Sequence, residues 1–433
     1  MNIRIKNKIL KQIKPTKIQK EFFEKKVNLF ISELENSKQK LNFKCDFIIG
    51  GSFGKGTYLK NDFDVDIFCR FQNSKNLSLD LEKILKKAKK KILKKKGSRD
   101  YFQIKENKLK FEIIPTIKID KIKEAHNTTE HSIYHVDFLK EKMSKDRNLV
   151  DEIRLAKQFF KAKKLYGAES YIQGFSGHII DLLVVYYGSF KKLLEGISNW
   201  KEQTIIDINK TYKSQKEILS KIEKDKQSNL IIVDPILKTR NAARALSCEN
   251  YFKAILLAQD KKNSLREKDF IIKNNTSKKE EQNTKKFAKE FDLKLIEYKI
   301  SIVKDFQSQD IVGSKLLKLN TRIEKYFLDL DFIVSKKNFF ISFDENICLF
   351  FFFIYPEMLP KIKTVYGPKI SMKSDVKKFL INKKKYFVEN DKICAYEKRK
   401  ITNINDASKL NKQDFRKILG KNIDFIKKIE IIK

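Results

Sequence analysis

The sequence predicts a multidomain α+β protein. Its 433 residues are enough for two to four domains, each with a core of its own. Apolar runs of strand length stand beside segments of helical periodicity in both the first and the last part of the chain. Residues 260–286 are rich in Lys, Asn, Ser, Thr and Glu and nearly lack aromatic residues. This composition is typical of a linker or mobile insertion, and we place a domain boundary there.

The part of the chain before residue 120 mixes strands with helices. Apolar residues at helical spacing predict amphipathic helices over 18–41 and 79–95. Apolar or alternating runs predict strands at 47–49, 64–68, 101–105 and 109–119. This region is therefore expected to form a sheet covered by helices.

The middle of the chain reads as mostly helical. Helices are predicted over 151–166, 178–190 and 240–246. Residues 126–147 contain three histidines and are predicted to be rich in loops. Residues 201–228 are polar, which indicates an insertion or a solvated helix.

Beyond residue 286 the pattern again mixes strands and helices. Strands are expected at 294–303, 339–343 and 347–355, with a helix at 314–328, and the tail adds a helix at 374–383 and a strand-like 386–396. The apolar run 347–355 is nine residues long, which is too short to span a bilayer. It is predicted to be a buried strand, and no contact with a membrane is expected.

The charge of the chain indicates a polyanionic partner. Lys and Arg number 94 against 55 acidic residues, a formal charge of +39. Such an excess favours binding to nucleic acid, although a coding bias toward lysine would account for part of it. The five cysteines show no C-x-x-C spacing, and the amino terminus lacks the apolar segment of a signal peptide. A reducing, cytoplasmic location is therefore expected.

A glycine-rich turn followed by paired aspartates is the most informative motif. Gly51 and Ser52 follow the strand at 47–49, and Asp64 and Asp66 alternate with apolar residues. Alternation along a strand puts both carboxylates on one face, where they repel unless a cation lies between them. Mg²⁺ suits this position because it binds one or two carboxylates together with substrate phosphates. The alternative is a tight turn before two solvated aspartates.

Two further features bear on this site. The pattern G-x-x-x-x-G-K-[ST] does not fit, because Gly56 follows Lys55 and the leading position is Ile49. Glu112 is a lone acid in an apolar strand, where burial without a partner is costly. It is either a third metal-facing carboxylate or an edge-strand residue facing water.

The full set of motifs resembles the archaeal CCA-adding enzymes, the class I tRNA nucleotidyltransferases. The glycine turn and paired aspartates alone mark only the wider polymerase-β-like nucleotidyltransferase superfamily, and the central motifs narrow it to this family. The motifs in order are Gly51-Ser52, Lys55-Gly56-Thr57, Asp64-x-Asp66, Phe111-Glu112-Ile113-Ile114-Pro115, Leu165-Tyr166-Gly167-Ala168-Glu169, Gly174-Phe175-Ser176-Gly177, Val233-Asp234-Pro235 and Arg240-Asn241. The resemblance covers nearly the whole chain.

The resemblance implies a template-independent polymerase that adds C, C and A to the 3′ end of tRNA from CTP and ATP, with Mg²⁺ as cofactor. It implies a polymerase-β-like catalytic domain at 1–135, a helical central domain at 136–259 and an α+β tRNA-binding domain at 287–433. A homodimer is compatible with it. The family usually carries Asp at the place of Glu112, which is one methylene longer and could shift the metal.

The resemblance also assigns site residues. Asp64, Asp66 and Glu112 fall on the catalytic, metal-binding carboxylates. The nucleotide-binding positions, from the triphosphate site to the base-reading arginine, are Gly51, Ser52, Lys55, His135, Lys157, Tyr166 and Arg240. Read without the family, Lys157, Tyr166 and Arg240 are ordinary helix-surface residues.

Two other function classes stay open at the level of sequence. One is another nucleotidyltransferase of the superfamily, such as a poly(A) polymerase or an oligoadenylate synthetase, which differs in product length and nucleotide choice. The other is an RNA-binding protein without catalysis, which the three acidic positions disfavour.

Overall fold

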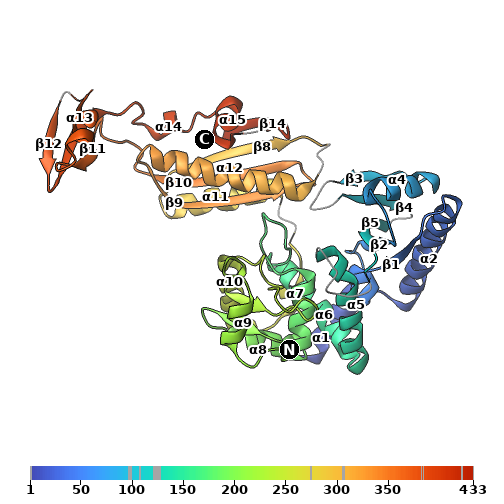
Figure 1. Ribbon diagram of the computed structural model, residues 1–433. Helices are drawn as coiled ribbons and strands as arrows, with labels where there is room; N and C mark the ends of the chain where they lie inside the picture. The colour runs from blue at the N-terminus through green and yellow to red at the C-terminus, as the bar shows by residue number, and fades with distance from the viewer. Residues whose placement is uncertain are drawn as a thin grey trace. The chain divides into compact units, whose positions relative to one another are not determined.

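The computed structural model describes residues 2–432 except 96–99, 107–108, 120–127, 274–275, 305–307, 382, 384 and 421–422. The chain forms two compact units, Met1–Lys273 and Asn274–Lys433 (Figure 1). Helices and strands occur in both units, so the α+β class predicted from the sequence is confirmed. The boundary between the units lies within the segment 260–286.

A five-stranded mixed sheet forms the first part of unit 1. Its strands, in spatial order, are β1 (Cys45–Ile49), β2 (Val65–Phe71), β5 (Leu109–Ile117), β4 (Tyr101–Glu106) and β3 (Leu93–Lys95). Strands β2 and β5 are parallel, and the other neighbours are antiparallel. The short helix α3 (Gly51–Lys55) fills the turn between β1 and β2.

Two helices cover one face of this sheet, as Figure 1 shows. They are α2 (Lys17–Lys40), with a capping box at Thr16, and α4 (Leu77–Lys87). Phe30 of α2 stacks on Phe111 of β5 with ring centroids 3.9 Å apart, in a core that includes Val65 and Ile113. Because side chains alternate along a strand, the residues between these core positions are on the opposite face. That face carries Asp66 and Glu112.

The remainder of unit 1 is mainly helical and has a core of its own. Its longer helices are α1 (Ile3–Ile13), α5 (Thr128–Lys145), α6 (Asn148–Ala162), α7 (Gly177–Tyr187), α8 (Phe190–Ser198) and α10 (Cys248–Lys261). The helices predicted over 151–166 and 178–190 are confirmed as α6 and α7. Helix α1 buries Ile9 and Ile13 in this core, so the amino-terminal residues pack with the central helices rather than with the sheet.

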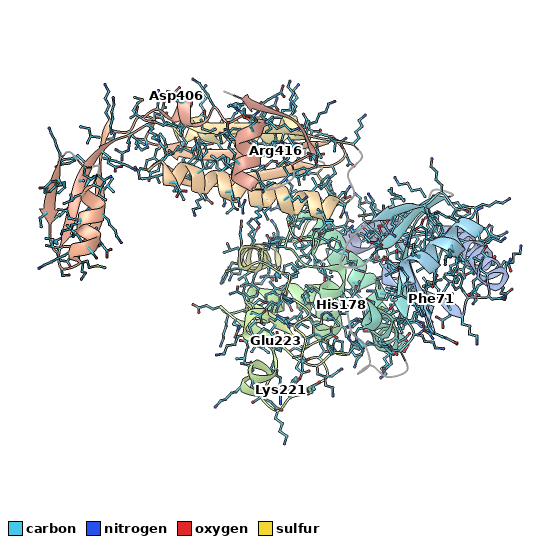
Figure 2. The ribbon with its side chains drawn as sticks, turned by 45° about the horizontal axis from the view of Figure 1, so that its top comes forward. Phe71, His178, Lys221, Glu223, Asp406 and Arg416 are labelled. Carbon is cyan, nitrogen blue, oxygen red and sulfur yellow. The ribbon has the colours of Figure 1, made fainter. Side chains whose placement is uncertain are left out.

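The polar segment at 201–228 adds short elements to this helical region. They are strand β6 (Thr204–Ile206), helix α9 (Gln215–Lys221) and the 3₁₀ turn η2 (Lys224–Lys226). Strand β6 pairs in parallel with β7 (Leu230–Ile232). A second 3₁₀ turn, η3 (Glu267–Phe270), follows α10. Lys221 and Glu223 are exposed and lie at an outer edge (Figure 2). Ile218 and Ile222 pack with Ile231 and Val233, which anchors the segment.

Three local predictions for unit 1 are wrong. Helix α4 ends at Lys87, and residues 93–95 form strand β3 because pairing with β4 competes with helix propensity. The segment predicted to be loop-rich holds helix α5, in which His131 and His135 are buried one turn apart and stand where apolar residues are expected. Residues 240–246 form turns and no helix, because the side chain of Asn241 bonds backbone groups of Ile232, Leu230 and Ala243.

Unit 2 is built on a four-stranded antiparallel sheet. The spatial order is β14 (Ile426–Ile432), β8 (Leu295–Ile302), β10 (Ile347–Tyr355) and β9 (Ile333–Ser342). Phe353 of β10 contacts Phe287 of α11 (Ser277–Glu290), and Phe352 contacts Phe327 of α12 (Gln309–Asp329). Neighbouring residues of β10 thus face different helices, so both faces of the strand are covered. This explains its uninterrupted apolar sequence.

The rest of unit 2 is a smaller sheet with short helices. The sheet has the order β11 (Ile362–Lys369), β13 (Lys392–Lys398) and β12 (Tyr386–Glu389), and the helices are α13 (Lys373–Leu380), α14 (Ile404–Ala407) and α15 (Lys412–Leu419). The strand predicted at 386–396 is a hairpin of β12 and β13. Segment 260–286, predicted as a linker or mobile insertion, contains η3 and most of α11 among its described residues.

Candidate active site

Three carboxylates gather on the face of the five-stranded sheet opposite α2 and α4. Asp66 of β2 lies directly across from Glu112 of β5 in the parallel register, and Asp64 directly precedes β2. Burial, and then the charges of Glu112 and Asp64, raise the pKa of Asp66 to about 7. The structure thus brings together the three acids that the sequence selects, and their mutual repulsion favours a bound cation.

The glycine turn is tied to the aspartate strand. The Gly50 amide donates to the Asp66 carbonyl at 2.8 Å. Gly51 has a φ of +55°, and a Cβ at this position would lie 1.6 Å from Oδ2 of Asp66. Glycine is therefore required here both for its left-handed backbone and for the close approach of the carboxylate. Ser52 follows in the first turn of α3.

Two lysines meet at one buried carboxylate, which the sequence did not single out. Lys55 of α3 and Lys157 of α6 both pair with Asp181 of α7, whose side chain is fully buried. Nζ of Lys157 lies 2.9 Å from Oδ1 of Asp181 and donates to Thr57 Oγ1 at 2.9 Å. Burial lowers the pKa of Lys157 to about 8, and the charge of Asp181 opposes this shift.

Tyr166 lies beside this lysine cluster. It forms a β-bridge with Phe175, and Nζ of Lys161 lies 4.6 Å from the centre of its ring. A Cβ at Gly177 would lie 2.8 Å from the tyrosine hydroxyl, so glycine at the start of α7 makes room for it. Burial, and then the charge of Asp181, raise the pKa of Tyr166, which keeps the hydroxyl protonated and able to donate.

His135, Asp234 and Arg240 form a second polar cluster. Asp234 is fully buried and accepts from His135 Nε2 at 2.7 Å and from Arg240 Nη1 at 2.5 Å. It also accepts from the amides of Ile236 and Leu237 at 2.9 and 3.1 Å. Burial acts to raise the pKa of Asp234, but the bond and charge of His135 and the charge of Arg240 outweigh burial and lower it. Asp234 therefore fixes both the histidine and the arginine.

His178 adds to this cluster, and the sequence did not single it out. Its ring centroid lies 4.4 Å from that of His135, and burial lowers its pKa, so the ring is neutral. Donor atoms of His135, His178 and Asp234 lie within 4.8 Å of one another, a spacing that could hold a metal ion. Because both oxygens of Asp234 already accept hydrogen bonds, we interpret the cluster as the support of Arg240.

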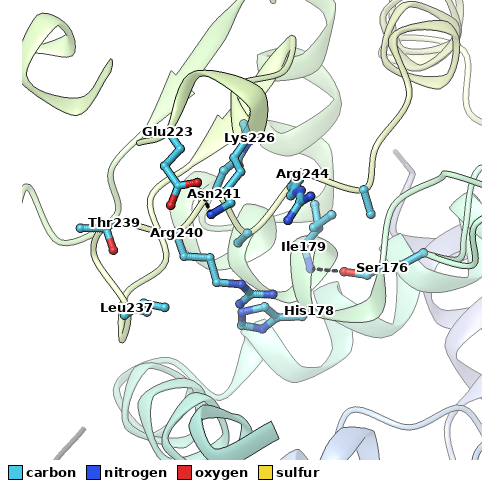
Figure 3. Close-up of a pocket in the computed structure, with 13 residues that line it drawn as sticks. Ser176, His178, Ile179, Glu223, Lys226, Leu237, Thr239, Arg240, Asn241 and Arg244 are labelled. Atoms are coloured by element: carbon cyan, nitrogen blue, oxygen red, sulfur yellow. Dashed lines mark hydrogen bonds and ion pairs between the residues drawn. The ribbon is translucent and has the colours of Figure 1, made fainter. Parts of the chain in front are cut away.

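A cavity of about 370 Å³ extends from Asp66 to Arg240. It is lined by Gly51, Lys55, Asp66, Phe68, Ser132, His135, Val136, His178 and Arg240. A second cavity, of about 610 Å³, shares His178 and Arg240 with it; Figure 3 shows these two side chains close together in its wall. Lys157 and Tyr166 line neither cavity, and Lys157 connects to this region through Asp181 and Lys55.

Lys110 is another residue of this region that the sequence did not single out. It stands two positions before Glu112 on β5, and its ammonium contacts Asp64 and Glu112 at 2.8 and 2.9 Å. Gln103 of β4 donates to Oε1 of Glu112 at 2.8 Å. The signal in the sequence that could have pointed to Lys110 is its spacing of two residues from Glu112 on the same strand.

Comparison with known proteins identifies the family of each part of the chain. Three family models match: a nucleotidyltransferase domain at residues 30–135, the second domain of tRNA nucleotidyltransferase at 151–271, and the C-terminal domain of CCA-adding enzymes at 299–432. In the described part of the chain, no helix combines the length and the apolar character needed to cross a membrane.

Individual CCA-adding enzymes are also similar to this chain. The chain is 34% identical to a CCA-adding enzyme of Nanoarchaeum equitans over 80% of its own length and 82% of the relative's. It is 28% identical to CCA-adding enzymes of Methanococcus maripaludis and Methanocaldococcus jannaschii, over 92% and 94% of its length and 89% of each relative. The motifs, the carboxylate face and these matches together place the chain in the CCA-adding enzyme family, the class I tRNA nucleotidyltransferases.

Proposed function

We propose that this chain adds C, C and A to the 3′ end of tRNA from CTP and ATP without a nucleic-acid template, with release of pyrophosphate at each step. The observation that carries the proposal is the cavity that joins Asp66 to Arg240, in a chain whose relatives are CCA-adding enzymes. It gives a nucleotide one wall for its phosphates and another for its base.

The carboxylate face fits Mg²⁺. Its acids supply the oxygen ligands that this ion prefers. Burial, and then the charges of Glu112 and Asp64, raise the pKa of Asp66, and the contacts of the Lys110 ammonium show that a cation fits between Asp64 and Glu112. When bound, Mg²⁺ would lower the barrier to attack by a 3′-hydroxyl and neutralise the departing pyrophosphate.

The residues of the chain would hold the triphosphate. Lys55 and Lys157 supply positive charge, and Asp181 keeps the two ammonium groups together. Gly51 lies against Asp66, Ser52 follows it in α3, and the Tyr166 hydroxyl stays protonated as a donor. Phosphoryl-type transfer depends mainly on positioning and on neutralised charge, which these groups provide.

Arg240 would read the base. Asp234 engages one nitrogen of its guanidinium, and arginine offers five N–H donors in a rigid plane. Cytosine presents an acceptor at N3 and adenine at N1, whereas uracil and guanine present N–H groups there. A fixed guanidinium can therefore donate a hydrogen bond to C or A. With U or G it would place its N–H donor against another N–H donor. His135, which Asp234 also holds, would contact the same nucleotide.

The body of the tRNA would bind through unit 2. The formal charge of +39 for the whole chain favours phosphate contacts, which read helical RNA by shape. A cytoplasmic location and a homodimer complete the proposal, and they rest on the cysteine pattern and on the family.

The test uses tRNA that lacks its CCA end, with Mg²⁺ and each labelled nucleotide in turn. We expect CTP to be incorporated twice, ATP once after it, and UTP and GTP hardly at all. Asp64→Asn is the control for an intact carboxylate site. Long adenosine tails would instead indicate a poly(A) polymerase, and tRNA binding without incorporation would indicate a non-catalytic RNA-binding protein.

A further inference from the structure

Lys110 lies next to the carboxylates of this face of the sheet. Residues two apart on a strand share a face, so Lys110 and Glu112 of β5 project to the side that Asp66 of β2 faces. The Lys110 ammonium lies 2.8 Å from Oδ2 of Asp64 and 2.9 Å from Oε1 of Glu112. It thus bridges two of the three acids, Glu112 in β5 and Asp64 just before β2.

The bridge occupies one oxygen of each of two carboxylates that the proposed metal would bind. The Lys110 side chain is 33% exposed, so it can swing into solvent without disrupting the core. Gln103 donates to Oε1 of Glu112 at 2.8 Å and keeps that carboxylate in place when the lysine leaves. A carboxylate oxygen that accepts an ammonium at hydrogen-bond distance cannot bind Mg²⁺ at its usual ~2.1 Å at the same time.

We infer that Lys110 is an internal counter-ion that competes with the divalent metal for Asp64 and Glu112 and so raises the metal concentration at which the site fills. The inference rests on the metal role proposed above for these carboxylates. An ammonium between like charges relieves their repulsion and keeps the acids close together. The doubly charged ion displaces it because its attraction to each carboxylate is larger at a shorter distance.

The test is direct binding of Mn²⁺, a spectroscopic substitute for Mg²⁺ at oxygen sites, measured on the full chain by electron paramagnetic resonance of the free ion. Lys110→Met is expected to bind Mn²⁺ about 3- to 10-fold more tightly than wild type, the scale of one or two partly exposed ion pairs. Half-maximal nucleotide addition should shift to lower Mg²⁺ by a similar factor.

Two control variants separate competition from general effects. Lys105 of β4 lies directly opposite Lys110, one strand or about 4.8 Å further from β2, so Lys105→Met removes the same charge without the bridge and should stay within about twofold of wild type. Lys110→Arg keeps a cation at the bridge and should likewise stay close to wild type. Circular dichroism checks that every variant is folded.

Mn²⁺ affinity that is unchanged or weaker in Lys110→Met overturns the inference, as does an equal gain in Lys105→Met, which would reduce the effect to net charge. The proposed function fails in a different way. If Lys110→Met changes Mn²⁺ affinity as expected but the wild-type chain does not extend tRNA, the CCA-adding proposal is refuted and the role of Lys110 stands.

Discussion

Replacing Asp66 by asparagine should make the metal-free protein more stable at pH 8 while removing its activity. Asp66 is crowded by Glu112 and Asp64, and its pKa is raised from 3.8 to about 7 by burial and by these two charges. Asparagine has nearly the same shape and carries no charge. The substitution therefore removes a destabilising charge together with a carboxylate that we propose binds the catalytic metal.

The sign and size follow from proton linkage. Because the folded-state pKa of Asp66 is above its unfolded value, the folded state binds more protons between pH 4 and 7, and stability falls as the pH rises through this window. The loss is complete above about pH 7. A shift of about three units corresponds to roughly 4 kcal/mol as an upper bound, and relaxation of the partly buried site reduces it to about 1–3 kcal/mol. Asp66→Asn should recover this amount at pH 8 and less than half of it at pH 5.

Urea unfolding in EDTA at pH 5 and pH 8 measures the difference between variant and wild type. Asp62→Asn, at an exposed aspartate outside the carboxylate face, is the matched control and should show no gain that depends on pH. Nucleotide addition by Asp66→Asn should fall by ~10³-fold or more. A variant that is less stable than wild type at pH 8, or a gain that is equal at both pH values, would refute the reasoning.

Three further outcomes are expected. Arg240→Ala should lower the use of CTP and ATP together and admit UTP, with ~10- to 100-fold less discrimination. Arg240→Lys should restore little of this selectivity, because one ammonium lacks the planar fork of the guanidinium. If the alanine variant keeps full speed and selectivity, Arg240 has only a structural role. Asp181→Ala should lower the free energy of unfolding by about 3–5 kcal/mol because it leaves two buried lysines without an acid, and adding Lys157→Met should restore part of the loss; an unchanged urea midpoint contradicts this. A chain that ends at Lys273 should bind nucleotide but lose most tRNA affinity and its steep dependence on salt, and equal affinity with an equal salt slope would exclude unit 2 as the tRNA-binding part.

The carboxylate pair could be predicted because its determinants are local. Alternation along one strand fixes the common face of Asp64 and Asp66, and glycine at position 51 leaves space for Asp66. The position of Glu112 depends instead on which strands pair and in what register, and the parallel pairing of β2 with β5 is a property of the tertiary fold. The lone acid in an apolar strand raised Glu112 as one of two alternatives, and the resemblance to a known family chose between them before the structure did.

The segments around His135 and Arg240 show where sequence patterns mislead. Helix α5 buries His131 and His135 on a face that periodicity expects to be apolar, so its polar residues suggested a loop. Around Arg240 the error is reversed, because small residues suggested a helix where Asn241 instead holds the backbone in turns. His135 bonds Asp234 directly, and Asn241 holds the turn next to Arg240, so in both places buried polar side chains depart from the usual pattern.

The counter-charges of the site were missed for a related reason. Motifs select groups that act on a substrate, whereas Asp181 and Lys110 act on other residues of the chain. Asp181 was visible as a lone acid in the apolar helix α7, and its partners are lysines from α3 and α6, which only the fold brings together. A site that collects two lysines and three carboxylates within one unit must balance each group before substrate arrives, since like charges in a shared, partly buried space are costly. A search for buried acids near predicted lysines, and for lysines two residues from a predicted carboxylate, would therefore extend such predictions from the reacting groups to those that hold them.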